Sequence, residues 1–213
     1  MPVLNTNGGM VKLSDVLISN VTSSDTDVLY IMSFLCTVER LTMKNCLGST
    51  LWRSSYVNIQ VSDSSFLSNY ALNGGIVFFS CIVNFTNTVI SDNTMEPEKG
   101  SVLVLSNTLF SAQVLTATNN NSTYGGTINS SGNSSLIIQD STFTFVTSQS
   151  PQILTNNRNN AAYAGGSIFV TDICYVDMYN TTVRKNLFIF SYLIMIEVSQ
   201  GTTTANGGGF YLT

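Results

Sequence analysis

The chain has 213 residues and a formal net charge of -4, and only 9% of its residues are charged. Its length fits one sizeable domain or one long repeat array, and is short for two independent cores. The acidic balance argues against a nucleic-acid partner, because binding a phosphate backbone needs a basic surface. Histidine is absent, which excludes Ser-His and Cys-His nucleophile pairs and most catalytic zinc sites.

Neutral polar residues take the place of charges. The chain holds 23 Asn, 28 Ser and 25 Thr, and its hydrophobic content is 44%, so we expect a folded chain with a surface of amides and hydroxyls. This composition favours an extracellular or cell-surface protein. The first residues have neither a basic start nor an apolar core and do not resemble a signal peptide. The most apolar stretch, 187–196, is too short to span a bilayer as a helix, and we expect a buried strand pair there.

Glycine runs divide the chain into units. Each run leads into β-forming residues and is therefore predicted to be a turn followed by a strand. The gaps between runs are rough multiples of a unit of about 20 to 25 residues, the size of one coil of a β-solenoid. In chain order the runs are Gly8-Gly9, Gly74-Gly75, Gly125-Gly126, Gly165-Gly166 and Gly207-Gly208-Gly209.

A strand motif recurs with the glycines. It reads apolar, any, apolar, any, Asp or Asn, and then an apolar residue three positions further on, because strict alternation buries one face of a strand. Asp and Asn accept left-handed backbone and end the strand, and stacked turns of this kind are expected to form internal amide ladders. Copies begin at Val11, Ile59, Val83, Leu136 and Val176, and Leu41-Thr42-Met43-Lys44-Asn45 matches all but the last position.

Alternation within these copies assigns side chains to two faces. The expected inward stack includes Leu13, Val61, Phe85, Ile138 and Met178. The expected outward column is Lys12, Thr42, Gln60, Asn84, Ile137 and Asp177. Since no stretch shows a helical apolar period with caps, we predict an all-β fold, a right-handed parallel β-helix (β-solenoid) of about nine coils. We expect a single domain over 1–213, as a segment of a longer chain or as a stacking subunit.

The repeats resemble a known family. Gly-Gly-x-apolar starts at Gly74 and Gly165 combine with the apolar-x-x-Asn copies Phe66-Leu67-Ser68-Asn69, Ile90-Ser91-Asp92-Asn93 and Val183-Arg184-Lys185-Asn186. This combination is similar to right-handed parallel β-helix repeats of the pectin-lyase-like class, nearest to the polymorphic-membrane-protein type found in surface adhesins and in large repetitive proteins of protists. The resemblance implies an architecture far more than an activity.

The cysteines and the N-glycosylation sequons are relevant to the cellular compartment of the protein. The four cysteines Cys36, Cys46, Cys81 and Cys174 lack zinc-type spacing and either form two disulfides or act as small buried hydrophobes. Seven Asn-x-Ser/Thr sequons are candidate N-glycosylation sites, although composition alone accounts for about six. They are Asn20, Asn84, Asn120, Asn121, Asn129, Asn133 and Asn180.

Candidate functional residues are scattered. The nearest acid and base candidates are Asp172, Asp177, Arg184 and Lys185, which we interpret as solvated surface because no outward column gathers carboxylates. The pairs Asp25/Asp27 and Glu96/Glu98 are weighed as calcium ligands against ordinary polar loops. Polar insertions at 118–135 and 149–164, with the aromatic side chains of Trp52, Tyr124 and Tyr163, are the candidates for glycan recognition, against packing between coils.

The sequence thus favours a non-enzymatic structural component of an extracellular or cell-surface fibre or assembly with an adhesive role. We expect no catalytic site, cofactor, metal or transmembrane segment, and we expect self-association end to end, with glycans as further candidate partners. The alternatives are a carbohydrate-active enzyme, either a polysaccharide lyase or a glycosidase, and a passive glycan-binding module on the same fold.

Overall fold

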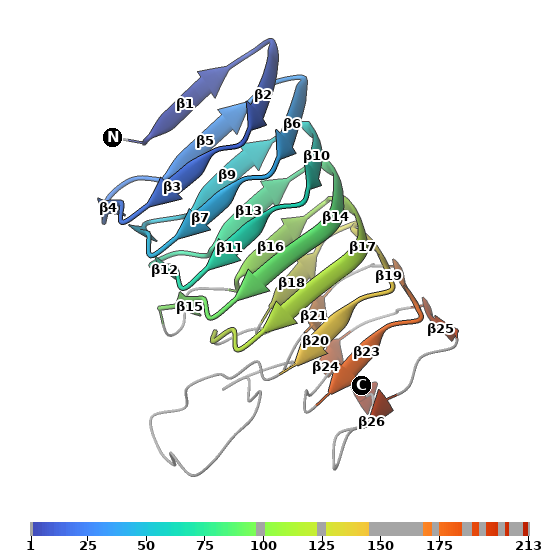
Figure 1. Cartoon of the computed structure of the whole chain (residues 1–213). Helices are drawn as coiled ribbons and strands as arrows, with labels where there is room; N and C mark the ends of the chain where they lie inside the picture. Colours follow the sequence, from blue (N-terminus) through green and yellow to red (C-terminus); the bar gives the residue numbers. More distant parts are fainter. Residues whose placement is uncertain are drawn as a thin grey trace.

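A computed structural model describes residues 2–96, 101–122 and 127–144, and the strand regions 168–171, 175–184, 189–191, 195–199, 203–204 and 211–212. Every regular element among these residues is a β-strand, and every strand pair is parallel. Figure 1 shows the strands stacked coil on coil along one axis. The predicted all-β parallel β-solenoid is confirmed.

Each coil begins in the first sheet. The nine strands of this sheet are stacked in chain order, so each strand pairs with the corresponding strand of the neighbouring coils. These strands are β1 (Leu4–Asn7), β5 (Leu29–Met32), β9 (Trp52–Ser55), β13 (Ile76–Phe79), β16 (Leu103–Ser106), β18 (Ile128–Ser131), β21 (Ile168–Thr171), β24 (Ile189–Ser191) and β27 (Tyr211–Leu212).

The chain then turns a corner into the second sheet, which has two connected branches. The first branch contains β2 (Met10–Ser14), β6 (Leu35–Glu39), β10 (Asn58–Ser62), β14 (Ile82–Ser91), β17 (Leu109–Thr118), β19 (Ser135–Gln139), β22 (Tyr175–Tyr179) and β25 (Met195–Ser199). The second contains β3 (Leu17–Ser19), β7 (Thr42–Lys44), β11 (Ser65–Leu67), β20 (Thr142–Thr144), β23 (Thr182–Arg184) and β26 (Thr203–Thr204), and the long strands β14 and β17 run through both branches.

A short third sheet closes each coil. It contains β4 (Thr22–Ser23), β8 (Leu47–Gly48), β12 (Tyr70–Ala71) and β15 (Thr94–Met95), and Thr94 bridges to Asn121 of the next coil. The described chain therefore completes about five coils round all faces, and the prediction of about nine is wrong. The expected unit of about 20 to 25 residues does not hold throughout, because strand partners in neighbouring coils are 20 to 40 residues apart in the sequence. The five coils that are complete on all faces occupy about 24 Å of the axis, at about 4.8 Å each.

The core lies between the sheets and is built from columns of inward side chains. Of the five residues expected to face inward, Val61, Phe85, Ile138 and Met178 are buried and Leu13 is half-buried against the core, as predicted. Aromatic rings pack edge to face between successive coils: the ring centroids of Trp52 and Phe78 lie 5.3 Å apart, as do those of Phe85 and Phe110. Burial of these columns supplies the main stabilisation of the fold.

One predicted motif copy is misplaced. Thr42 belongs to β7 and pairs with Leu17 and Ser65, so it lies in the second branch and not in the outward column of Lys12. Thr37 occupies that column, between Lys12 and Gln60. The prediction was wrong because each coil has two corners at which Asp or Asn adopts left-handed backbone, and the motif does not distinguish them.

The described glycine runs have the predicted role. Gly74 has a φ of 122°, and a Cβ on Gly75 would lie 2.4 Å from the carbonyl oxygen of Val102 in the next coil. A side chain at Gly75 would thus collide with the main chain of a neighbouring coil. The runs at 125–126, 165–166 and 207–209 lie outside the described residues, but a strand begins shortly after each, as expected.

Candidate functional site

Three corners of the coil hold backbone in the left-handed region. The outer corner, between the two branches of the second sheet, has φ between 44° and 58°. Most of its residues are Asp or Asn, which tolerate this conformation because their short polar side chains bond locally. In successive coils the outer corner is Asp15, Arg40, Asp63, Asn87, Val114, Asp140 and Asn180.

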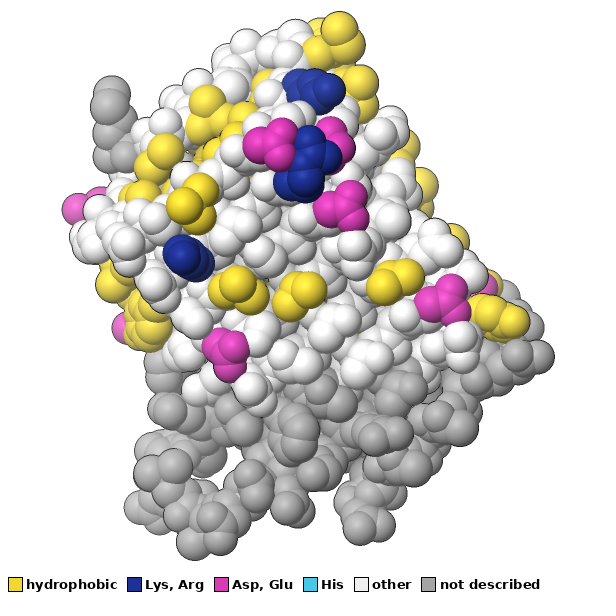
Figure 2. Space-filling view, in the orientation of Figure 1, with side chains coloured by type: hydrophobic (Ala, Val, Ile, Leu, Met, Phe, Trp, Pro, Cys, Tyr) yellow, Lys and Arg dark blue, Asp and Glu magenta, His cyan; other side chains and the backbone are white. Residues whose placement is uncertain are grey.

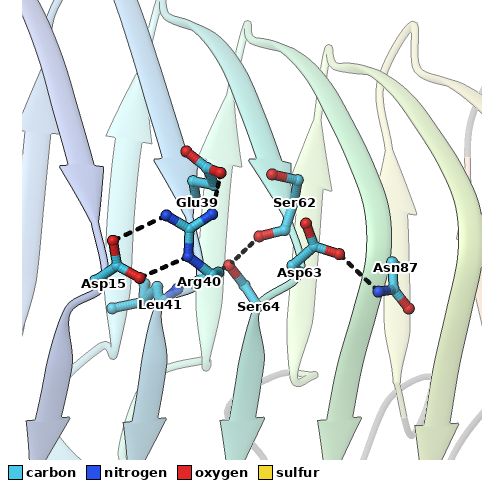
Figure 3. A network of polar contacts seen from close by, with 8 residues as sticks. All are labelled: Asp15, Glu39, Arg40, Leu41, Ser62, Asp63, Ser64 and Asn87. Carbon is cyan, nitrogen blue, oxygen red and sulfur yellow. Dashed lines mark hydrogen bonds and ion pairs between the residues drawn. The ribbon is translucent and has the colours of Figure 1, made fainter.

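Charged side chains at the outer corner pair across coils, as Figure 3 shows. Arg40 binds both carboxylate oxygens of Asp15, with Nε–Oδ1 at 2.5 Å and Nη2–Oδ2 at 2.8 Å, and also contacts Glu39. The hydrogen bond from Arg40 lowers the pKa of Asp15, partial desolvation opposes this shift, and the positive charge of Arg40 adds to the lowering. These carboxylates are therefore held in ion pairs, each of small energetic weight because both partners are exposed.

Amide–carboxylate pairs continue the outer corner. Asn87 donates from Nδ2 to Oδ1 of Asp63 at 2.6 Å, and Asn180 donates to Asp140 at 2.6 Å. Asp63, Asn87 and Asn180 are exposed and Asp140 is half-buried. The prediction of an internal amide ladder at the motif's Asp and Asn positions is therefore wrong, because these side-chain pairs form on the outside of the solenoid. Figure 2 shows a group of charged side chains over the upper coils of the face in view, with others lying singly over the rest of that face.

A second amide ladder lies inside the core. This ladder follows the inner corner, which lies between the second branch of the second sheet and the short third sheet. The inner-corner residues with positive φ are Asn20, Asn45, Ser68, Asp92 and Asn119. The next residue in three successive coils is a buried asparagine, namely Asn69, Asn93 and Asn120. The sequence pointed to Asn69 and Asn93 through the apolar-x-x-Asn pattern. Asn120 follows Ala117 in the same pattern but was not among the copies identified from the sequence.

Each asparagine of the inner ladder connects three coils. Oδ1 of Asn93 accepts the main-chain N–H of Asn69 at 3.1 Å and its side-chain amide at 2.9 Å. Nδ2 of Asn93 donates to the carbonyl oxygen of Phe66 at 2.9 Å and to Oδ1 of Asn120 at 3.1 Å. Cys46 precedes the ladder, and its N–H donates to Oδ1 of Asn69. The ladder therefore pairs main-chain groups that the corners leave unpaired in the core.

The three described cysteines are buried and unpaired. Cys36, Cys46 and Cys81 face the core, and burial raises the pKa of Cys36 to about 12. These thiols therefore behave as small hydrophobes, which is one of the two expected roles. Cys174 lies outside the described residues.

The sequons occupy different surroundings. Asn20, Asn84, Asn133 and Asn180 are exposed, and Asn121 and Asn129 are half-buried. Asn120 is fully buried, and its Nδ2 donates to the carbonyl oxygen of Ile90 at 2.9 Å. A glycan on Asn120 would require that side chain to leave the core.

The weighed acid and base residues do not come together among the described residues. Asp177 is half-buried in β22 and lies in register with Ile137 and Glu197, and Arg184 lies in β23. Asp172 and Lys185 lie outside the described residues. Of the first weighed calcium pair, Asp25 is exposed, and Oδ2 of Asp27 lies 3.1 Å from Nε of Arg53. Of the second pair, Glu96 is half-buried and Glu98 lies outside the described residues. The described ranges contain no group of three or more Cys, Asp or Glu side chains suited to a metal ion.

Trp52 is part of the core. It is fully buried, lies 6.3 Å from Phe66, and donates from Nε1 to Oγ of Ser54 at 2.9 Å. Trp52 is thus unavailable for stacking on a sugar ring. Tyr124, Tyr163 and the segment 149–164 lie outside the described residues, whereas the expected insertion at 118–135 includes Asn120 and the regular strand β18.

Comparisons with known proteins yield no match: no family model, curated protein or solved structure is significantly similar to the chain. Among the described residues, no helix has the length and apolar character needed to cross a membrane.

Proposed function

We propose that the protein is a non-enzymatic structural component of an extracellular or cell-surface fibre and that it assembles end to end. The observation that carries this proposal is the parallel stacking of the coils, in which the described strands pair with the corresponding strands of neighbouring coils in all three sheets. Parallel main-chain pairing of this kind can be extended by strands of a second copy.

The apolar cross-section of the first coil supports the same proposal. Leu4, Val11, Leu13, Val16 and Val21 pack against the core on one side but are only partly buried. A coil of a second copy would cover these side chains and extend all three sheets. Such a head-to-tail contact uses two different surfaces and therefore propagates without closing, as a fibre requires.

The use of acidic side chains favours a structural role over a lyase or glycosidase. Asp15, Asp63, Asp92 and Asp140 each interact with a side chain of a neighbouring coil. Each of these carboxylates thus binds a side chain of a neighbouring coil. Glycoside cleavage instead needs two carboxyl groups that face one substrate. The likeness to polymorphic-membrane-protein-type repeats adds a surface-adhesin role to the proposal.

The proposed location outside the cell rests on the neutral polar surface and on exposed sequons. Asn20, Asn84, Asn133 and Asn180 can accept a glycan without disturbing the core. Treating the protein from its native source with an N-glycosidase should then increase its electrophoretic mobility. Unchanged mobility and a mass without glycan would contradict the glycoprotein proposal. This outcome would not bear on end-to-end assembly, which a separate experiment tests.

The assembly test compares two added charges in the first coil. Val11→Lys places a charge on the inward, half-buried side of β2, and Asn5→Lys places the same charge on the exposed side of β1. We expect wild type and Asn5→Lys to form concentration-dependent fibres in electron micrographs and in sedimentation, and Val11→Lys to stop at small particles. Circular dichroism checks that both variants are folded.

Discrete particles of constant size for all three proteins would refute end-to-end assembly. A glycan array and a polysaccharide depolymerisation assay on the same samples then distinguish the remaining alternatives. Binding without cleavage identifies a glycan-binding module, and cleavage identifies an enzyme.

A further inference from the structure

An exposed apolar strip follows the corner where the first sheet turns into the second. Met10 and Phe34 are 80% and 82% exposed, Tyr56 is 69% exposed, and the other members are 40% to 52% exposed. Together these side chains form the corner strip: Met10, Phe34, Tyr56, Phe79, Ile82 and Leu109. Figure 2 shows hydrophobic side chains along this edge of the molecule, on the right beside β2, β6 and β10 as placed in Figure 1.

The corner strip extends from the first coil to the fifth, and the exposed polar residue Asn58 stands between Leu35 and Ile82 in its register. Met10 pairs in register with Leu35 of the second coil, and Ile82 pairs with Leu109 of the fifth. The ring of Tyr56 lies 5.7 Å from the ring of Phe79 and nearly perpendicular to it. Phe79 and Ile82 belong to the same coil, and the other neighbouring members are one coil apart, about 4.8 Å along the axis.

The flank of the corner strip on the second sheet is almost uncharged. The outward column beside the strip begins with Lys12 and continues with Thr37, Gln60, Asn84 and Ser111, which are all neutral. The ion pairs of Asp15, Glu39 and Arg40 lie at the other end of the same strands. Two identical surfaces that face each other bring like charges together, so a neutral strip suits self-pairing.

The area of the corner strip matches a dimer interface. From the exposed fractions, its six side chains present roughly 700 Å² of apolar surface, more than the 300 to 600 Å² typical of the largest patch on a monomer. A standard interface buries about 800 Å² per partner. We propose that the corner strip binds the corner strip of a second copy, so that two solenoids lie side by side in a closed pair.

This lateral pair is independent of end-to-end assembly. The corner strip lies on the side of the solenoid, whereas the open strand edges lie at its first coil. Pairing through one shared strip is isologous and stops at two copies, while head-to-tail stacking has no fixed end. The two contacts can therefore coexist in one fibre or fail separately.

The test measures association of the full chain by sedimentation velocity from about 1 to 100 μM, with protein from a host that does not N-glycosylate. The double variant Phe34→Ser/Tyr56→Ser removes the aromatic part of the strip. Serine suits the second site, because Ser80 holds the same corner position at positive φ in the next coil. Leu17→Ser is the matched control, since Leu17 is 61% exposed but lies in β3, away from the strip.

We expect wild type and Leu17→Ser to form dimers, and the double variant to raise the dimer dissociation constant by at least tenfold. Because Tyr56 lies in the middle of the five coils, Tyr56→Cys should also crosslink to itself with a short bis-maleimide, whereas Leu17→Cys should not. A monomeric wild type, or a double variant that dimerises as well as wild type, overturns the proposal. Open-ended growth that the double variant leaves unchanged also overturns it, while supporting end-to-end assembly.

Discussion

At the scale of the residue, the corners depend on side chains that tolerate left-handed backbone. Asp, Asn and Ser supply most of these positions, and Tyr56 and Arg40 supply two more. Val114 is the exception at the outer corner, because it has a φ of 58° and a β-branched side chain. Branching at Cβ makes this conformation costly, whereas Asn87 and Asp140 hold the same place in the neighbouring coils at little cost.

Replacing Val114 by asparagine should therefore stabilise the protein. We expect Val114→Asn to raise the free energy of unfolding by about 1 kcal/mol, because asparagine relieves the backbone strain and little buried area is lost at an exposed site. Val77→Asn is the control, since Val77 is a half-buried strand residue without positive φ and its replacement should destabilise. Urea unfolding of protein made in bacteria measures both. A Val114→Asn variant less stable than wild type would contradict the strain argument.

At the scale of the element, the strands are joined by two ladders of different character. The outer ladder is solvated, and its pairs hold exposed side chains together. The inner ladder is buried, where water cannot reach, so each of its hydrogen bonds satisfies a polar group that would otherwise have no partner. The inner ladder therefore contributes more to holding successive coils in register.

Breaking the inner ladder at its centre tests this difference. Asn93→Ala leaves the main-chain N–H of Asn69 and the carbonyl oxygen of Phe66 without the partners that Asn93 provides. We expect a loss of about 2 to 4 kcal/mol in the free energy of unfolding. The control is Asn84→Ala on the exposed side of the same coil, which should change stability by less than about 0.5 kcal/mol. Equal effects of the two variants would show that burial of the amide is unimportant.

The sequence predicted the strands better than it predicted their ladders. Alternation around Val61 and Phe85, and the collision that a side chain at Gly75 would cause, follow from local chemistry. The positions of Asn87 and Asn93 could not be distinguished in this way. Asn87 is itself a left-handed corner residue and Asn93 follows one, and only packing between coils makes the first exposed and the second buried. The same ambiguity led to the misplaced copy at Thr42.

At the scale of the whole molecule, stability depends on contacts between nearest-neighbour coils. A coil inside the stack has partners on both sides, whereas among the described residues the first coil is paired on one side. Such quasi-one-dimensional proteins lose structure first where a coil lacks a neighbour. Burial follows the same trend, since the inward residues of β10 are buried and those of β2 are only half-buried.

This trend predicts a gradient of amide hydrogen exchange. In dilute protein, the amides of β2 should exchange at least about tenfold faster than those of β10, because opening β2 breaks one ladder and opening β10 breaks two. Exchange followed by mass spectrometry on peptides covering 10–14 and 58–62 measures the ratio. If strands of a second copy add to the first coil, raising the protein concentration should slow exchange in β2 and leave β10 unchanged. The Val11→Lys variant should lose that concentration dependence. Equal exchange of β2 and β10 in dilute solution would contradict the one-sided pairing of the first coil, and with it the edge on which end-to-end assembly depends.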